Sequence, residues 1–271
     1  RSVSSAASDV YKRQIVSNYS FIDKKNIKNS IFFLDEKESH HVSSVLRLKE
    51  DSEIMLTDGQ GTVYQGIIKE ISKKLISGKI INENKIQERK NYKIHLALPL
   101  IKNNRFKIAL EKSIELGVDE LTPIKFDKSV KSSINSEKIL SITHSACKQS
   151  MRAYFPKVNK LMTFEQWYNP NAINVVCVID SEKTFLEQLS FIKDHYSDNH
   201  LFNLIVGPEG DFSENEKNFI NEKNFIKVNL GGTILRTETA IVSLISIVNE
   251  LLINNESVSY THLTLPTKLS V

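Results

Sequence analysis

Two glycine turns, each following an apolar run, are the parts of this sequence best suited to bind a ligand. The first lies in residues 204–213 (LIVGPEGDFS) and the second in residues 230–240 (LGGTILRTETA). Glycine lacks a side chain, so the backbone at such turns can approach a ligand closely and adopt positive φ. If the two apolar runs are neighbouring strands, the turns form a backbone-lined pocket at the strand ends, where open α/β sheets bind ligands.

Among the charged side chains in these two stretches, three are candidates for chemistry: Glu209, Arg236 and Glu238. An arginine between an apolar strand and an apolar helix usually serves an anion or a fixed hydrogen-bonding role. Glu238 also fits a simpler role, because an acidic residue after a Thr237 cap interacts favourably with the helix dipole. Capping and ion pairing would equally explain Glu209. The turns match neither a phosphate loop nor a dinucleotide fingerprint, which disfavours a nucleotide-binding protein.

Composition and charge are those of a soluble globular protein. The 271 residues are 40% hydrophobic and 25% charged, and no apolar run is long enough to span a bilayer. Two cysteines, Cys147 and Cys177, do not make a disulfide framework, which fits a reducing cytoplasm. Residues 1–14 contribute +2 of the formal charge of +4. Any nucleic-acid-binding surface must therefore come from local patches.

The chain order predicts two domains between two tails. Residues 1–14 and 256–271 match neither the periodicity nor the composition of their neighbours and resemble translated cloning sequence. Residues 15–86 predict a small β-barrel with a hairpin turn at Asp58–Gly61, because short strands alternate with tight turns. The expected strands are 31–34, 53–57, 62–71 and 75–81, with a short helix within 39–48. The polar segment 82–91 is the expected boundary.

Residues 91–255 predict an α/β domain, because apolar strands alternate with amphipathic helices. Such repeats imply a mainly parallel sheet covered on both faces. The last helix, 239–252, is so apolar that we expect it to be buried in the domain or in a dimer interface. The expected strands are 93–100, 120–126, 174–179, 202–206 and 225–230, and the other expected helices are 106–116, 136–149, 182–193 and one beginning at the capping box 213–216.

The paired motifs GPEGDFS and LGGTILRTETA resemble those of the SPOUT methyltransferases, in the variant of the RsmE family. The segment HHVSSVLRLKE (40–50) is similar to that family's N-terminal signature in a PUA-like RNA-binding domain. The resemblance implies an N-terminal PUA-like β-barrel and a trefoil-knotted α/β domain. It also implies a homodimer that methylates uridine N3 in 16S ribosomal RNA of the small subunit, using S-adenosyl-L-methionine and no metal.

The same resemblance assigns the cofactor to the two glycine turns. An apolar pocket with backbone donors and acceptors suits adenine. The implied contacts are Leu204, Ile205, Gly207, Pro208, Gly210, Leu230, Gly231, Ile234, Leu235, Thr237 and Ala240.

Methylation of uracil N3 requires loss of the N3 proton, and the resulting anion spreads onto O2 and O4. A positioned cation stabilises such an anion, so Arg236 is the candidate for that role or for holding an RNA phosphate. Glu209 or Glu238 is the candidate proton acceptor. The methyl transfer itself requires mainly alignment.

Four basic residues are candidate RNA contacts, each with a solvated or structural alternative: Arg47, Lys102, Arg105 and Arg152. Residues 146–152 (ACKQSMR) follow a family pattern, but Lys148 replaces an acidic residue and Met151 replaces a glycine. A helix C-terminus would also account for Lys148 and Arg152. For His40 and His41 we favour a polar helix start over metal binding, because no further ligands stand at suitable spacing.

Two other functions compete with this assignment. A related SPOUT enzyme would methylate a ribose 2′-hydroxyl, but the signature at 40–50 disfavours it. A non-catalytic RNA-binding protein would keep the pocket as a relic, which the intact glycine turns and Arg236 disfavour.

Overall fold

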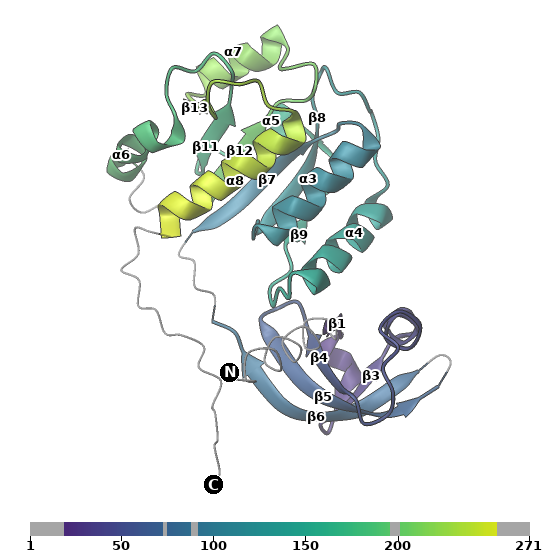
Figure 1. Ribbon diagram of the computed structural model, residues 1–271. Coiled ribbons are helices and arrows are strands. Elements are labelled where there is room, and N and C mark those ends of the chain that lie inside the picture. Colours follow the sequence, from purple (N-terminus) through teal and green to yellow (C-terminus); the bar gives the residue numbers. More distant parts are fainter. Residues whose placement is uncertain (1–18, 73–74, 88–91, 196–200, 254–271) are drawn as a thin grey trace, which may run out of the picture.

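The computed structural model describes residues 19–72, 75–87, 92–195 and 201–253. Both tails, and residues 88–91 of the expected boundary, lie outside these ranges. Figure 1 shows two units, one above the other. We call the lower one the N-terminal unit (19–87) and the upper one the C-terminal unit (92–253). No helix within the described ranges is both long and apolar enough to cross a membrane.

The N-terminal unit is one curved six-stranded sheet (Figure 1). Its pairings are antiparallel except for β1 with β4, which is parallel. The strand order is β1-β4-β5-β6-β3-β2. The strands are β1 (Tyr19–Phe21), β2 (Ile27–Lys28), β3 (Ile31–Leu34), β4 (Glu53–Thr57), β5 (Thr62–Ile71) and β6 (Ile76–Lys85).

The predicted hairpin between β4 and β5 is confirmed, and Asp58 organises its turn. The Asp58 carboxylate accepts hydrogen bonds from the backbone N–H of Gln60 at 2.8 Å and of Thr62 at 2.9 Å. Gly61 has φ of +96°, a conformation that suits glycine. The following strand β6 runs to Lys85, so the expected polar boundary begins inside a strand.

The expected helix within 39–48 begins earlier than predicted. Helix α2 (Glu36–His40) starts after Asp35, which accepts a hydrogen bond from Glu38 N at 2.8 Å, and continues as a π-helical turn (His41–Val45). The two histidines therefore lie in the middle of the helical segment, and their expected place at a helix start was wrong. The helical segment starts at α2, where the Asp35 side chain caps the first turn.

The C-terminal unit is a seven-stranded sheet with parallel pairings throughout its described strands. The order is β10-β8-β7-β12-β11-β13, with β9 beside β8. The mixed α/β fold with a mainly parallel sheet is thus as predicted. The strands are β7 (Lys93–Pro99), β8 (Glu120–Lys125), β9 (Lys157–Val158), β10 (Met162–Thr163), β11 (Ile173–Cys177), β12 (Leu201–Val206) and β13 (Ile226–Val228).

Helices cover both faces of this sheet (Figure 1). The largely apolar central strands allow this because successive side chains point to opposite faces. Leu204 packs with the cluster beneath α8, whereas Ile205 packs with the aromatic cluster of the other face. The helices are α3 (Asn103–Glu115), α4 (Ser136–Gln149), α5 (Phe164–Trp167), α6 (Phe185–His195), α7 (Glu214–Glu222) and α8 (Thr237–Ile253). The short elements β9, β10 and α5 were not predicted.

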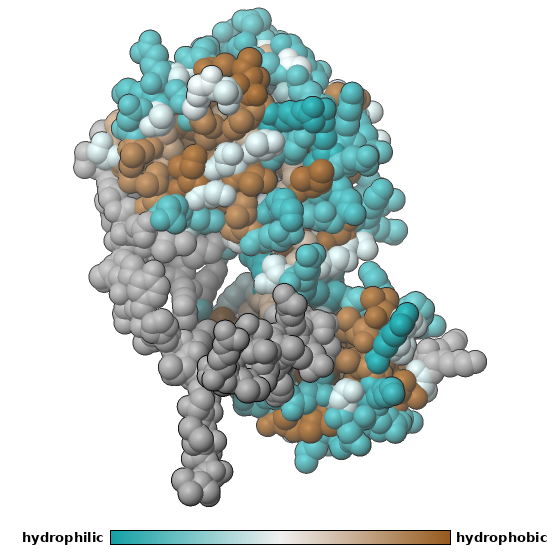
Figure 2. All heavy atoms as spheres, viewed as in Figure 1, coloured by the Kyte–Doolittle hydropathy of each residue, from teal (hydrophilic) through white to brown (hydrophobic). Residues whose placement is uncertain are grey.

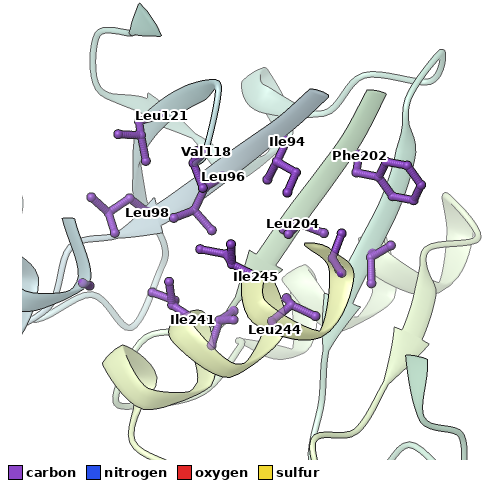
Figure 3. Close-up of a cluster of buried hydrophobic side chains, with 14 of the residues drawn as sticks. Ile94, Leu96, Leu98, Val118, Leu121, Phe202, Leu204, Ile241, Leu244 and Ile245 are labelled. Atoms are coloured by element: carbon purple, nitrogen blue, oxygen red, sulfur yellow. The ribbon is translucent and has the colours of Figure 1, made fainter. Parts of the chain in front are cut away.

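Helix α8 buries one side against the sheet, as its composition predicts. In Figure 3, Ile241, Leu244 and Ile245 point toward side chains of β7 and β12. All three are 0% exposed. Full burial of an Ile or Leu side chain contributes about 1.5–3 kcal/mol. This packing holds the start of α8 in a fixed position beside the end of β12.

The segment after α4 joins the two units. Gly61 N donates to Ala153 O and Phe155 N donates to Gly59 O, both at 2.9 Å. The ring of Phe155 packs against Phe21 and His144, with centroids 5.6 and 5.2 Å away. Backbone pairing and ring packing together orient the N-terminal sheet relative to the C-terminal unit.

Candidate active site

A cavity of about 500 Å³ lies at the carboxyl ends of β11, β12 and β13. We call it the strand-end cavity. Because parallel strands end on the same edge of a sheet, the loops that follow them converge there. Its wall contains Arg105 and three segments, 177–179, 206–211 except Gly210, and 229–237, together with Ala240. Both glycine turns singled out in the sequence therefore open into one cavity.

Most of the predicted cofactor contacts line this cavity. Eight do so: Gly207, Pro208, Leu230, Gly231, Ile234, Leu235, Thr237 and Ala240. Leu204 and Ile205 do not, because both are 0% exposed and packed in the two cores of the sheet. Gly210 is also outside the wall, and a Cβ added there would meet the Lys128 side chain. Cofactor contact by these three residues stays a prediction, and on β12 the cavity wall begins at Val206.

Sequence reasoning missed the contribution of β11. Cys177, Val178 and Ile179 line the cavity, and Val178 N donates to Val228 O at 3.0 Å. Burial raises the pKa of the Cys177 thiol to about 11, so it remains protonated at neutral pH. The apolar run 174–179 was a recognisable strand, but its place between β12 and β13 had no local signal.

The two glycine turns are tied directly to each other. The Thr237 hydroxyl donates to Gly207 O at 3.2 Å, and Gly231 has φ of +120° with open space where a side chain would stand. Ala240 N donates to Arg236 O, so Arg236 occupies the capping position of α8. The expected capping role of Thr237 was therefore wrong, since its hydroxyl donates to Gly207 O in the other glycine turn.

Arg105 forms a charged cluster with both candidate proton acceptors. Its Nη1 lies 2.8 Å from Glu209 Oε1, and its Nε lies 3.7 Å from Glu238 Oε1. The side chains of Arg105, Glu209 and Glu238 are 31%, 17% and 12% exposed. The second carboxylate oxygens of the two glutamates are buried and accept no hydrogen bond within the described part of the chain. We call these three residues the Arg105 cluster.

Arg236 stands apart from that cluster. Its side chain is exposed, yet the residue contributes to the cavity wall. A cation at the rim can meet a ligand that enters from solvent. The cavity wall thus carries two cations, Arg105 and Arg236, two carboxylates, Glu209 and Asp211, and backbone polar groups.

The remaining candidate RNA contacts are scattered. Lys102 is exposed immediately before α3, and Arg47 is exposed in the N-terminal unit with φ of +54°. Arg152 instead donates to the carbonyls of Ile114 and Val118, at 3.0 and 2.8 Å. The contact with RNA predicted for Arg152 stays a prediction, but its guanidinium caps the end of α3.

The unusual residues of segment 146–152 have structural partners. Lys148 Nζ lies 2.7 Å from Glu38 Oε1 in the N-terminal unit, and these side chains are only 13% and 7% exposed. Met151 has φ of +54°, the left-handed conformation that glycine adopts most easily. The structure therefore keeps the backbone of a glycine position and uses Lys148 to join the two units.

No group of three or more His, Cys, Asp or Glu side chains in the described ranges is arranged to hold a metal ion.

Comparison with known proteins places both units. Residues 88–249 match the family described as an RNA methyltransferase domain, and residues 34–81 match an RNA methyltransferase PUA domain. The ribosomal RNA small subunit methyltransferase E of Buchnera aphidicola is 31% identical over 226 residues, covering 79% of this chain and 85% of that protein. Its namesake "E 2" from Borreliella burgdorferi is 32% identical over 223 residues, covering 79% and 88%.

Two solved structures have the same fold over most of their length. A putative methyltransferase from Legionella pneumophila, in complex with the bound cofactor SAM, has 25% identity and a TM-score of 0.76, covering 86% of this chain and 97% of that one. A predicted RNA methyltransferase from Thermotoga maritima has 29% identity and a TM-score of 0.66, covering 86% and 99%.

Proposed function

Because the chain belongs to the RNA methyltransferase family that includes the ribosomal RNA small subunit methyltransferases E, we propose that it methylates N3 of a uridine in 16S ribosomal RNA. The methyl donor is S-adenosyl-L-methionine (SAM). The observation that carries the proposal is the strand-end cavity, in which two glycine turns and the end of β11 meet.

The cavity fits this cofactor in size and chemistry. Its volume of about 500 Å³ falls in the range of small-molecule sites, which combine an apolar lining with a few polar groups. Leu230, Leu235 and Val178 supply apolar surface, and the turns at Gly207 and Gly231 supply backbone polar groups. The free carboxylate oxygens of the Arg105 cluster suit a cationic ligand. When bound, SAM supplies an electrophilic methyl group.

Side chains of this protein would accept the N3 proton of the substrate uracil and stabilise the negative charge that develops on it. We assign Arg236 to the anion that develops on uracil O2 and O4, because it is an exposed cation on the cavity wall. Glu209 or Glu238 would accept the N3 proton. Removal of one such electrostatic donor in other enzymes costs about 10²–10³ in kcat.

The N-terminal unit would hold the RNA backbone. We propose that residues 15–86 form a PUA-like barrel domain, that residues 91–255 form the methyltransferase domain, and that residues 1–14 and 256–271 are tails of artefactual origin. The exposed Arg47 and Lys102 would contact phosphates, which position RNA without reading its sequence. The hydrogen bonds and ring packing that segment 153–155 makes with the N-terminal unit support a fixed spacing between these contacts and the cavity.

We further propose that the chain carries the trefoil knot of SPOUT enzymes. This proposal is supported by the position of the C-terminal segment, which comes back to the end of β12, where Thr237 hydrogen-bonds to Gly207. Pulling the unfolded chain by its ends would tighten such a knot. An extension equal to the full contour length of the chain would refute it.

A homodimer is the proposed working form, in the cytoplasm where ribosomal RNA is assembled. Apolar side chains gather on the visible face that carries α8 (Figure 2). The partly buried Ile247, Leu251 and Leu252 of α8, and the exposed Ile179 and Ile234 of the cavity wall, are the kind of surface that a partner covers. Sedimentation analysis would test it.

The decisive experiment incubates the protein with labelled SAM and small ribosomal subunits that lack the modification, followed by nucleoside mass spectrometry. We expect labelled 3-methyluridine from the wild type and a loss of about 10²–10³-fold in Arg236→Ala. Lys69→Ala, on the exposed surface of β5, is the matched control and should retain activity.

Other products would contradict the proposal in distinct ways. Label in a 2′-O-methyl nucleoside would refute base methylation. Absence of both label and SAM binding would favour a non-catalytic RNA-binding protein.

A further inference from the structure

The Arg105 cluster has an unequal charge count. One guanidinium faces two carboxylates, Glu209 at 2.8 Å and Glu238 at 3.7 Å, which leaves a formal charge of −1. The second oxygens of both carboxylates are buried without a hydrogen-bond partner in the described ranges. Unpaired buried acceptors are costly unless a ligand or ion compensates for them.

The cluster lies where it can act on a ligand in the strand-end cavity. Arg105 and Glu209 belong to the cavity wall. Glu238 is not part of the wall; it lies in the first turn of α8, and its carboxylate is 3.7 Å from the wall residue Arg105. Low exposure of all three side chains limits screening by water and salt. Their charge therefore acts on any charged group in the cavity.

The two ligands of a methyltransferase cycle differ by one positive charge. The methyl donor carries a sulfonium cation, whereas its demethylated product, S-adenosylhomocysteine, carries a neutral thioether. Apolar and backbone contacts in the cavity are common to both ligands. A net charge near the sulfonium therefore separates the two ligands more strongly than uncharged contacts do.

We propose that the Arg105 cluster makes the strand-end cavity prefer the sulfonium cofactor over the neutral product; this inference rests on the proposed function. The cluster attracts the donor and offers less to the product, so it limits product inhibition. Arg105 serves as a positioning residue that holds both carboxylates, and the RNA contact predicted for it is replaced by this role.

The expected size follows from Coulomb's law. One unit charge acting across about 10 Å, at an effective dielectric constant of about 20, changes affinity by roughly tenfold to twentyfold. Glu238→Gln keeps the shape of the side chain, removes the excess negative charge and alters no residue of the cavity wall. It should weaken binding of SAM by about tenfold and leave binding of S-adenosylhomocysteine within about twofold.

The test is isothermal titration calorimetry of the full chain with three ligands: SAM, S-adenosylhomocysteine and a SAM analogue with a protonated amine in place of the sulfonium. The charged analogue should follow SAM. Asp211→Asn is the matched control, because Asp211 belongs to the cavity wall but pairs with Lys217 at 3.1 Å and is 54% exposed. In Asp211→Asn, the ratio of the affinities for SAM and S-adenosylhomocysteine should change by less than about twofold.

If Glu238 only maintained the shape of the cavity, its replacement would weaken binding of SAM and of S-adenosylhomocysteine to the same extent. Equal weakening of SAM and S-adenosylhomocysteine in Glu238→Gln, or an unchanged ratio, would overturn the inference while leaving the proposed function intact. If Glu238→Gln does not fold, Glu209→Gln provides the same comparison. Failure of the wild type to bind either ligand would overturn both proposals.

Discussion

Removing the charge of Lys148 should destabilise the protein far more than removal of a surface lysine. Lys148 Nζ lies 2.7 Å from Glu38 Oε1, and the two side chains are 13% and 7% exposed. In Lys148→Met the Glu38 carboxylate would remain buried without its cation. Breaking a buried pair by removing one partner costs about 3–5 kcal/mol, a large part of the stability of a typical domain.

Urea unfolding followed by circular dichroism measures this cost, with Lys69→Met as the matched control. Lys69 pairs with Asp51 at 2.6 Å, but the side chains are 56% and 78% exposed, so its loss should cost at most about 1 kcal/mol. The double variant Glu38→Leu, Lys148→Met should recover most of the stability, because replacing a whole buried pair by apolar residues is often neutral.

Because this pair joins the two units, its loss should also separate their unfolding transitions. A cost below about 1 kcal/mol for Lys148→Met would show that Glu38 is well solvated or finds another partner. A double variant as unstable as the single one would show that packing, and not charge, explains the loss.

Three further predictions concern pH, glycine packing and thiol reactivity. Burial lowers the pKa of three histidines, His41, His95 and His144. As pH falls, these histidines are protonated in the unfolded chain before they are protonated in the folded protein. The free energy of unfolding, measured with urea, should therefore decrease as pH falls through about 6.5 and level off below the folded pKa values. Gly78→Ala should destabilise strongly in thermal melts, because its Cβ would lie 2.2 Å from Ile67 O, whereas Gly232→Ala should melt like the wild type, since its Cβ meets nothing within 4 Å. Cys177, whose pKa burial raises to about 11, should react slowly with iodoacetamide at pH 7.5 and more slowly still with SAM present; rapid labelling that SAM does not affect would contradict its place in the cavity wall.

Local structure was largely readable in the sequence, because it depends on residues close together in the chain. The helix predicted at 136–149 has those bounds. The Ser213 capping box is present with Glu216, and Gly117, with φ of +85°, follows the end of α3. Caps, turns and apolar periodicity act within a few residues, so no knowledge of the rest of the fold is needed.

The sequence by itself therefore determined the two glycine turns, their order after apolar strands and the class of fold. Tertiary structure decided which strands are neighbours, and so brought β11 into the cavity wall. It also chose the partners of charged residues far apart in the chain: Arg105 meets Glu209 across 104 positions, and Lys148 meets Glu38 across 110. Such pairs form only when packing of the apolar faces brings distant segments together. Because the hydrophobic effect is non-directional, the sequence around a charged residue does not show which distant residue will become its partner.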